Sequence, residues 1–355
     1  MTTLSTIRSN WPHRCATLLA ALLALPSAAL AHHSRFVYDT SELVEVRGTI
    51  ESVFWRNPHV MISVRGTGES GQPGESGEEA VYQLEAGPVN AFERAGIFED
   101  AVVVGAPVTV LGFASQRNAH DMQPVRLDYG NGRNVVLSDE WAVSLGMLDE
   151  AHERAAIDPA QVARAIEEAD GLFRVWVNTG RTYIDRNLPL RPAAQAAKDA
   201  WDQPSDDVAL RCDPAGLPEA MVSPFPVELV DNGDTITVRL EEWDNVRTIH
   251  MNPETAPVDP EPSRLGHSVG HWEGDELVVT TDRINYLFLD DRGTPQSEAV
   301  EIAERFVMSE DETRMDWHAT LVDDNTFTAT VRLPIMHYEW VPGEQIKVYD
   351  CTVSE

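Results

Sequence analysis

The chain has 355 residues, with 27 basic and 58 acidic side chains and a formal net charge of −31. This balance excludes a nucleic-acid-binding surface of the usual kind, because phosphate binding needs clustered Lys and Arg, and it disfavours docking on anionic lipid. Hydrophobic residues make up 43% of the chain, so it can bury a core and is not disordered as a whole. The length allows two or three domains.

The first 31 residues are predicted to be a signal peptide. They contain Arg8 and Arg14, no acidic residue, an apolar run from Ala16 to Leu25, and the small-residue sequence Ala29-Leu30-Ala31. A membrane anchor is the alternative, but the run is shorter than the roughly 20 apolar residues that cross a bilayer. We therefore expect a periplasmic or secreted protein with no membrane span after processing.

The processed chain contains two cysteines, Cys212 and Cys351. An even count in an oxidising compartment predicts one disulfide, and two buried free thiols are the alternative. Closing a loop of about 140 residues should stabilise the fold by roughly 4 to 5 kcal/mol on the chain-entropy model.

Residues 32–138 are predicted to form an OB-like five-stranded β-barrel. A short helix is expected between the third and fourth strands, where an OB-type barrel carries one, and this favours a barrel over a sandwich. The strands are indicated by short alternating apolar runs at 44–54, 60–64, 81–84, 108–113 and 125–127.

Residues 139–204 are predicted to be a connector of helices and loops, with a helix that starts at Pro159. Residues 205–355 alternate strongly and contain obvious turns, such as Asp231-Asn232-Gly233-Asp234. This pattern predicts seven or eight antiparallel strands in a meander. Because closure removes exposed edges, we expect a lipocalin-like barrel with an interior cavity, and a solid sandwich is the alternative.

Several motifs resemble two uncharacterised families of secreted bacterial proteins. The first resemblance covers about a hundred residues and the second covers the last module, where the family often has His at the position of Gln296. Neither resemblance implies an activity. The first motifs are His32-His33-Ser34, Arg47-Gly48-Thr49-Ile50, Trp55-Arg56-Asn57-Pro58-His59 and Val104 to Val110; the second are Arg211-Cys212, Gly266 to Asp275 and Glu304-Arg305-Phe306.

A metal site is predicted at the new N-terminus. Cleavage after Ala31 would give His32 a free amine beside its ring nitrogen, and His59 or His120 would complete a three-nitrogen set. Such a set suits Cu(II), which leads the first-row divalent ions in affinity for nitrogen ligands. A cleavage site shifted by one residue would transfer the chelate to His33. Alternatively, His59 is an ordinary hydrogen-bonding residue on a turn.

In the last module, strand parity predicts which ionisable groups point inward. Glu304 is the one charged member of an otherwise apolar strand face, and His337 ends another such face, with His267 on the parity of Leu265 and Val269. A buried carboxylate and imidazole can shuttle a proton, so these three are candidate catalytic residues. The alternative is that Glu304 pairs with an arginine, such as Arg239 or Arg332.

The cavity is expected to bind a hydrophobic small molecule. The predicted ligand-binding side chains are Trp272, Phe306, Trp317 and Ile335. His267 and His271 cannot share an ion, because residues four apart on a strand are separated by about 13 Å.

Two main functions follow. The first is an exported binding protein with copper at its N-terminus and a hydrophobic ligand in its second barrel. The second is an acid/base isomerase, lyase or hydrolase in that barrel, and a purely structural envelope protein is a third possibility. No phosphate loop, Gly-x-Ser-x-Gly elbow or Cys-x-x-Cys motif is present.

Overall fold

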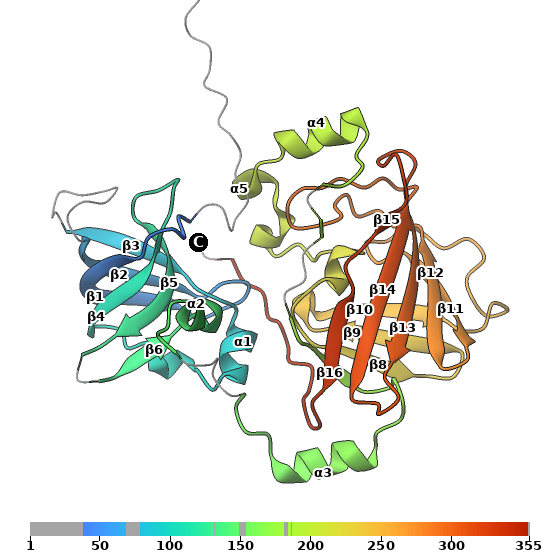
Figure 1. Ribbon diagram of the computed structural model, residues 1–355, viewed down its shortest axis with the longest axis horizontal. Helices are drawn as coiled ribbons and strands as arrows, with labels where there is room; N and C mark the ends of the chain where they lie inside the picture. Colours follow the sequence, from blue (N-terminus) through green and yellow to red (C-terminus); the bar gives the residue numbers. More distant parts are fainter. Residues whose placement is uncertain are drawn as a thin grey trace, which may run out of the picture. The chain divides into compact units, whose positions relative to one another are not determined.

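The computed structural model describes residues 38–68, 79–130, 132–148, 154–180, 184–185 and 187–353. All of these residues fall within one compact unit, His32–Glu355, and the predicted signal peptide lies outside the described residues. The fold is mainly β, as predicted, and contains two closed barrels (Figure 1). No helix in the described part of the chain has both the length and the apolar character that a bilayer crossing requires.

The first barrel has five strands, which confirms the prediction. Its strand order is β3-β2-β1-β4-β5, and a parallel pairing of β3 with β5 closes it, with Leu84 opposite Met122. Helix α1 (Val89–Arg94) lies between β3 and β4 in the sequence, and β6 (Asn134–Val136) extends the sheet beside β5. The barrel strands are β1 (Val44–Phe54), β2 (Met61–Gly68), β3 (Ala80–Glu85), β4 (Pro107–Ala114) and β5 (Asp121–Asp128).

The alternation that identified these strands reflects a filled barrel interior. Ile50 in β1, Ile62 in β2 and Leu84 in β3 are completely buried. The residues directly before and after each of them are more exposed. Gly48 is needed because a Cβ atom there would lie 2.2 Å from the carbonyl oxygen of Arg65 on the paired strand. The glycine of the Arg47-Gly48-Thr49-Ile50 motif therefore permits the close approach of β1 and β2.

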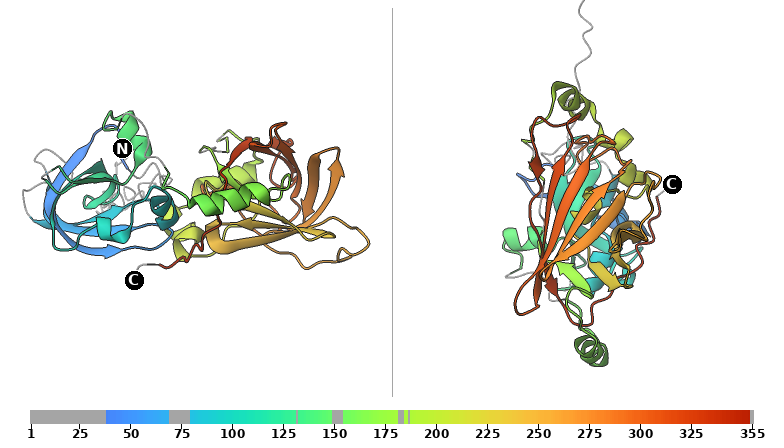
Figure 2. Two further views of the ribbon diagram at one scale, coloured as in Figure 1. Left: turned by 90° about the horizontal axis from the view of Figure 1, so that it is seen from below. Right: turned by 90° about the vertical axis from the view of Figure 1, so that its right-hand side faces the viewer.

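The second barrel has nine strands in the order β13-β12-β11-β10-β9-β8-β7-β16-β14, and pairing of β13 with β14 closes it (Figures 1 and 2). Strand β15 (Val331–Arg332) pairs with β14 outside this ring. The nine strands are β7 (Val175–Asn178), β8 (Val227–Asp231), β9 (Thr235–Leu240), β10 (Asn245–His250), β11 (His267–Glu273), β12 (Glu276–Asp282), β13 (Glu301–Met308), β14 (Arg314–Val322) and β16 (Met336–Trp340).

Two features of this barrel differ from a simple meander. Strands β10 and β11 are parallel, because the long segment between His250 and His267 returns the chain to the same end of the sheet. Strand β7 precedes residue 205 and is inserted between β8 and β16. The barrel therefore combines strands that are distant in the sequence.

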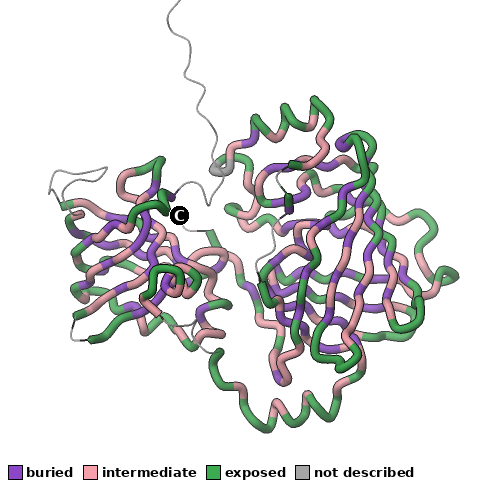
Figure 3. Tube along the Cα trace, viewed as in Figure 1, coloured by how far each residue is buried: buried purple, intermediate pink, exposed green. Residues whose placement is uncertain are grey.

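Large side chains fill the interior of the second barrel. Trp176, Phe306, Met315 and Trp317 are completely buried and belong to one hydrophobic core. Buried and exposed positions alternate along its strands (Figure 3). The indole N–H of Trp176 donates to the carbonyl oxygen of Leu172 at 2.9 Å, so this buried polar group is satisfied.

The α-helices other than α1 are short and lie mainly between the two barrels in the sequence. They are α2 (Asp139–Ser144), α3 (Pro159–Glu167), α4 (Pro192–Ala200) and α5 (Gln203–Asp206). Helix α3 begins at Pro159, as predicted, and the Asp158 carboxylate caps it by accepting from the Ala160 N–H at 2.9 Å.

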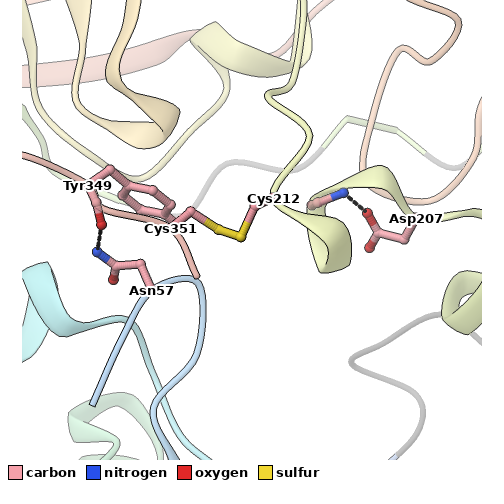
Figure 4. The surroundings of a disulfide bond; sticks show 6 residues. Asn57, Asp207, Cys212, Tyr349 and Cys351 are labelled. Atoms are coloured by element: carbon pink, nitrogen blue, oxygen red, sulfur yellow. Dashed lines mark hydrogen bonds between the residues drawn. A yellow bond between two sulfur atoms is a disulfide. The ribbon is translucent and has the colours of Figure 1, made fainter. Parts of the chain in front are cut away.

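The predicted disulfide is present. Cys212 and Cys351 are bonded, with Cα atoms 5.7 Å apart and a sequence separation of 139 (Figure 4). The bond holds the C-terminal segment against the short helical turn Val208–Arg211, which Asp207 caps through the Ala209 N–H.

Candidate functional site

A polar cluster forms where strands β3 and β5 close the first barrel. It consists of Tyr38, His59, Glu85, His120 and Asp121, and is called the closure cluster below. The Tyr38 hydroxyl donates to Glu85 Oε2 at 2.9 Å, and His59 Nε2 lies 3.7 Å from Glu85 Oε1. Glu85 ends β3 and Asp121 begins β5, so the parallel pairing brings both carboxylates to one end of the barrel.

The closure cluster has a negative electrostatic character. Burial, followed by the charge of Glu85, raises the pKa of the Tyr38 hydroxyl. Burial also raises the pKa of Asp121, and repulsion from Glu85 adds to this shift. A bound cation would relieve the repulsion between these two carboxylates.

Two of the four predicted metal ligands belong to this cluster. The His59 side chain is 40% exposed, and its Nδ1 lies 3.2 Å from the Ala86 carbonyl oxygen. The His120 ring packs edge-on against Tyr82, with centroids 5.3 Å apart. His32 and His33 lie outside the described residues. Within the described ranges, no three His, Cys, Asp or Glu side chains are placed to hold an ion.

Asn57 of the Trp-x-Asn-Pro-His motif has a structural role that sequence reasoning missed. It is buried, and its Oδ1 accepts from the Val89 N–H at 2.8 Å. Its Nδ2 donates to Asn90 Oδ1 at 3.0 Å and to the carbonyl oxygen of Tyr349 (Figure 4). The Thr352 N–H in turn donates to the Asn57 carbonyl oxygen at 2.9 Å. The motif therefore binds the C-terminal segment.

A buried ion pair reinforces the contact between the first barrel and the C-terminal segment. Glu241 is fully buried and accepts from Arg94 Nη1 at 2.6 Å and Nη2 at 2.5 Å. It also accepts from Asn90 Nδ2 and from the Lys347 N–H, each at 2.9 Å. Arg94 Nε donates to Glu344 Oε1 at 3.0 Å. No local sequence signal links residues so far apart in the chain.

Glu304 points into the second barrel, as parity predicted, but it is engaged in a saturated network. Arg247 binds both of its oxygens, through Nη1 at 2.9 Å and through Nη2. Trp317 Nε1 and Thr281 Oγ1 each donate to it at 3.0 Å. The alternative of an arginine partner is therefore correct in kind, although the partner is Arg247 and not Arg239 or Arg332.

His337 does not face the interior. Its side chain is 58% exposed, and its Nδ1 lies 2.7 Å from Asp316 Oδ1. The parity argument was wrong because it treated 327–337 as one strand. The chain leaves the sheet after Arg332 and re-enters it at Met336. Met336 is buried, so the next residue, His337, points outward.

His267 is also on the outer face of the barrel. Its neighbour Ser268 is the inward residue and accepts a hydrogen bond from Arg247 Nε at 3.0 Å. Leu265 is buried, but Gly266 adopts a left-handed conformation (φ 67°) that interrupts the alternation. Glu304, His337 and His267 therefore have different partners and do not form one catalytic group.

The four predicted ligand-binding side chains also do not share a face. Phe306 and Trp317 are completely buried in the core, whereas Trp272 is 44% and Ile335 is 39% exposed. Trp272 packs edge-on against Phe173 with centroids 6.2 Å apart. These four residues cannot line a single cavity.

A group of acidic side chains that the sequence analysis did not identify lies near Tyr286. This acidic group consists of Glu219, Glu242 and Asp291. Tyr286 donates from its hydroxyl to Glu219 Oε2 at 2.9 Å. Burial and repulsion from Asp291 raise the pKa of Glu219 well above its usual range. Burial raises the pKa of Glu242 to about 7, although a hydrogen bond with Ser223 opposes the shift. More than twenty residues separate Glu219 from Glu242 in the sequence, so no local pattern revealed them.

Gln296 lies beside this acidic group. Its Nε2 donates to the carbonyl oxygens of Leu217 at 2.7 Å and of Tyr286 at 3.0 Å. Gln296 is buried, and these bonds fix it between the segment that leads to Glu219 and the one that carries Tyr286.

Comparison with known protein families gives a match in the first part of the chain. Residues 20–123 match a family of unknown function, DUF6152. The matched range includes strands β1 to β4 and every residue of the closure cluster. Neither the curated proteins nor the solved structures contain a match to the chain.

Proposed function

We propose that the protein is an exported copper-binding protein whose metal site is at the closure cluster. The observation that carries this proposal is the position of Glu85, which accepts a hydrogen bond from Tyr38 and lies 3.7 Å from His59 Nε2. Tyr38 follows His33 by five positions in the sequence, so a histidine at the start of the processed chain would have to span only a few residues to approach His59.

The reach of the chain supports this assignment. His33 is separated from Tyr38 by five residue steps, which span at most about 17 Å when extended. His32 would supply its α-amino nitrogen and one ring nitrogen, and His59 or His120 would supply a third. Cu(II) is the divalent ion best suited to such a set.

Charge and compartment also support the proposal. Glu85 and Asp121 repel one another across the closure cluster, and a divalent cation would offset that repulsion. The Cys212–Cys351 disulfide is typical of proteins that mature in an oxidising compartment, which agrees with export through the predicted signal peptide.

Copper titration of naturally processed protein, followed by electron paramagnetic resonance, tests the proposal. We expect one nitrogen-rich Cu(II) signal that is lost when a single extra residue precedes His32, because the extra peptide bond removes the free amine. His59→Ala and His120→Ala identify which ring completes the set. His337→Ala is the matched control, because this exposed histidine lies in the second barrel. An unchanged signal from the extended protein would refute the N-terminal site.

A further inference from the structure

Two histidines lie side by side on the outer face of the second barrel. His250 ends β10 and His267 begins β11, and their ring centroids are 5.2 Å apart with 33° between the ring planes. The buried residues Ile249 and Ser268 face each other in the parallel register. Because side chains alternate along a strand, His250 and His267 project to the opposite, outer face.

The surroundings of His267 leave one ring nitrogen without a partner. Its Nδ1 lies 3.7 Å from Asp282 Oδ1, on the residue opposite it in β12. Its Nε2 is buried and accepts no hydrogen bond within the described part of the chain. A carboxylate that accepts a hydrogen bond from one imidazole nitrogen leaves the lone pair of the other nitrogen free for a metal, and Asp282 lies just beyond hydrogen-bond distance of Nδ1.

The spacing of the two rings fits one shared ion. A metal about 2.0 to 2.1 Å from a ring nitrogen lies about 3 Å from the ring centroid, so the centroids of two ligating imidazoles are about 4 to 6 Å apart. The observed 5.2 Å falls in this range. Burial and the neighbouring His267 lower the pKa of His250, which favours the neutral ring that can act as a ligand.

We propose that His250 and His267 form a second binding site for a divalent transition-metal ion, independent of the closure cluster. Two imidazoles bind the ion, Asp282 orients His267, and water completes the coordination. The site has two protein ligands, because no group of three His, Cys, Asp or Glu side chains in the described residues could hold an ion. Cu²⁺ is the ion of this class that imidazole binds most strongly.

The test uses CuCl2 titration of the full processed protein by isothermal titration calorimetry, with the number of bound equivalents as the readout. We expect two equivalents in the wild type, and one fewer in both His250→Ala and His267→Ala. Asp282→Asn should retain the equivalent but weaken its binding by about tenfold, the lower end of the effect of removing an orienting carboxylate. His271→Ala is the matched control, because this exposed histidine lies on the same strand.

Combining these variants with the extra residue before His32 separates the two proposals. If only the closure-cluster site is wrong, the extended protein that carries His267→Ala still binds one equivalent of copper fewer than the extended protein without that substitution. If only the histidine pair is wrong, His250→Ala and His267→Ala bind as many equivalents as the wild type. Circular dichroism confirms folding, and His250→Ala provides a second variant should His267→Ala fail to fold. Undiminished stoichiometry in a folded variant overturns the proposal.

Discussion

Asn57 donates its side-chain amide to the carbonyl oxygen of Tyr349, a residue 292 positions later in the chain. The same side chain accepts from the Val89 N–H, and the Asn57 carbonyl accepts from the Thr352 N–H. One residue of a short motif thus stabilises the start of α1 and the end of the chain together. It therefore links the first barrel to the C-terminal segment.

Asn57→Ala should lower the free energy of unfolding by about 2 to 3 kcal/mol, because it removes the hydrogen-bond partner of the half-buried Val89 N–H and of the carbonyl oxygen of buried Tyr349. Urea denaturation measures the change. Asn187→Ala, at an exposed loop position, should change stability by less than about 0.5 kcal/mol. Equal effects of the two substitutions would contradict the structural role of Asn57.

Glu304→Gln should destabilise the protein by about 3 to 5 kcal/mol, because it leaves Arg247 buried beside a neutral partner. Glu276→Gln is the control, since its pair with Arg305 is exposed and should contribute less than about 1 kcal/mol. The two unfolding midpoints in urea provide the comparison. A loss at Glu304 no larger than that at Glu276 would show that the network is not a major stabilising element.

Glu242→Gln should stabilise the protein at pH 8, and the gain should diminish as the pH falls toward 4.5. Burial raises the folded-state pKa of Glu242 to about 7 from a usual value of 4.5, so the folded state binds more protons between these values. Stability from this group is therefore present below the unfolded pKa and is lost as pH rises through the folded pKa.

The gain at pH 8 should be on the order of 1 to 3 kcal/mol, because one pKa unit corresponds to about 1.4 kcal/mol and the largely buried Glu242 keeps some contact with solvent. Urea midpoints at pH 5 and pH 8 measure it. Glu254→Gln, at an exposed position, is the control and should change stability by less than about 0.5 kcal/mol. A stabilisation that grows at low pH would have the wrong sign.

Cys212→Ala combined with Cys351→Ala should reduce stability by about 4 to 5 kcal/mol on the chain-entropy model, because the bond closes 139 positions of sequence. Thermal and urea unfolding should agree, and reduction of the wild type with dithiothreitol should give a similar loss. If the doubly substituted protein unfolds at the wild-type midpoint, the bond does not contribute to stability.

Local alternation predicted much of the fold. The five strands of the first barrel, the helix beginning at Pro159 and the inward position of Glu304 each follow from patterns within a few residues. The prediction for His337 failed because Val331–Arg332 and Met336–Trp340 are separate strands, and a break between strands resets the parity.

Partners that are distant in the sequence could not be predicted. Arg247 reaches Glu304 because β10 and β13 are brought into the same wall of the barrel, with β11 and β12 between them. The adjacency of His250 and His267 depends on the parallel pairing of β10 with β11, which alternation alone does not reveal. Parity assigns a face of a strand, but the strand order decides which side chains meet.

The position of β7 between β8 and β16 affects how the last module can be produced separately. A recombinant fragment that begins at residue 205 would lack Val175–Asn178 and leave two unpaired strand edges. Such edges promote intermolecular pairing, so the fragment should precipitate or form oligomers. A fragment that begins before Gly171 retains the missing strand, and is the better starting point for crystallisation or labelling of this half of the molecule.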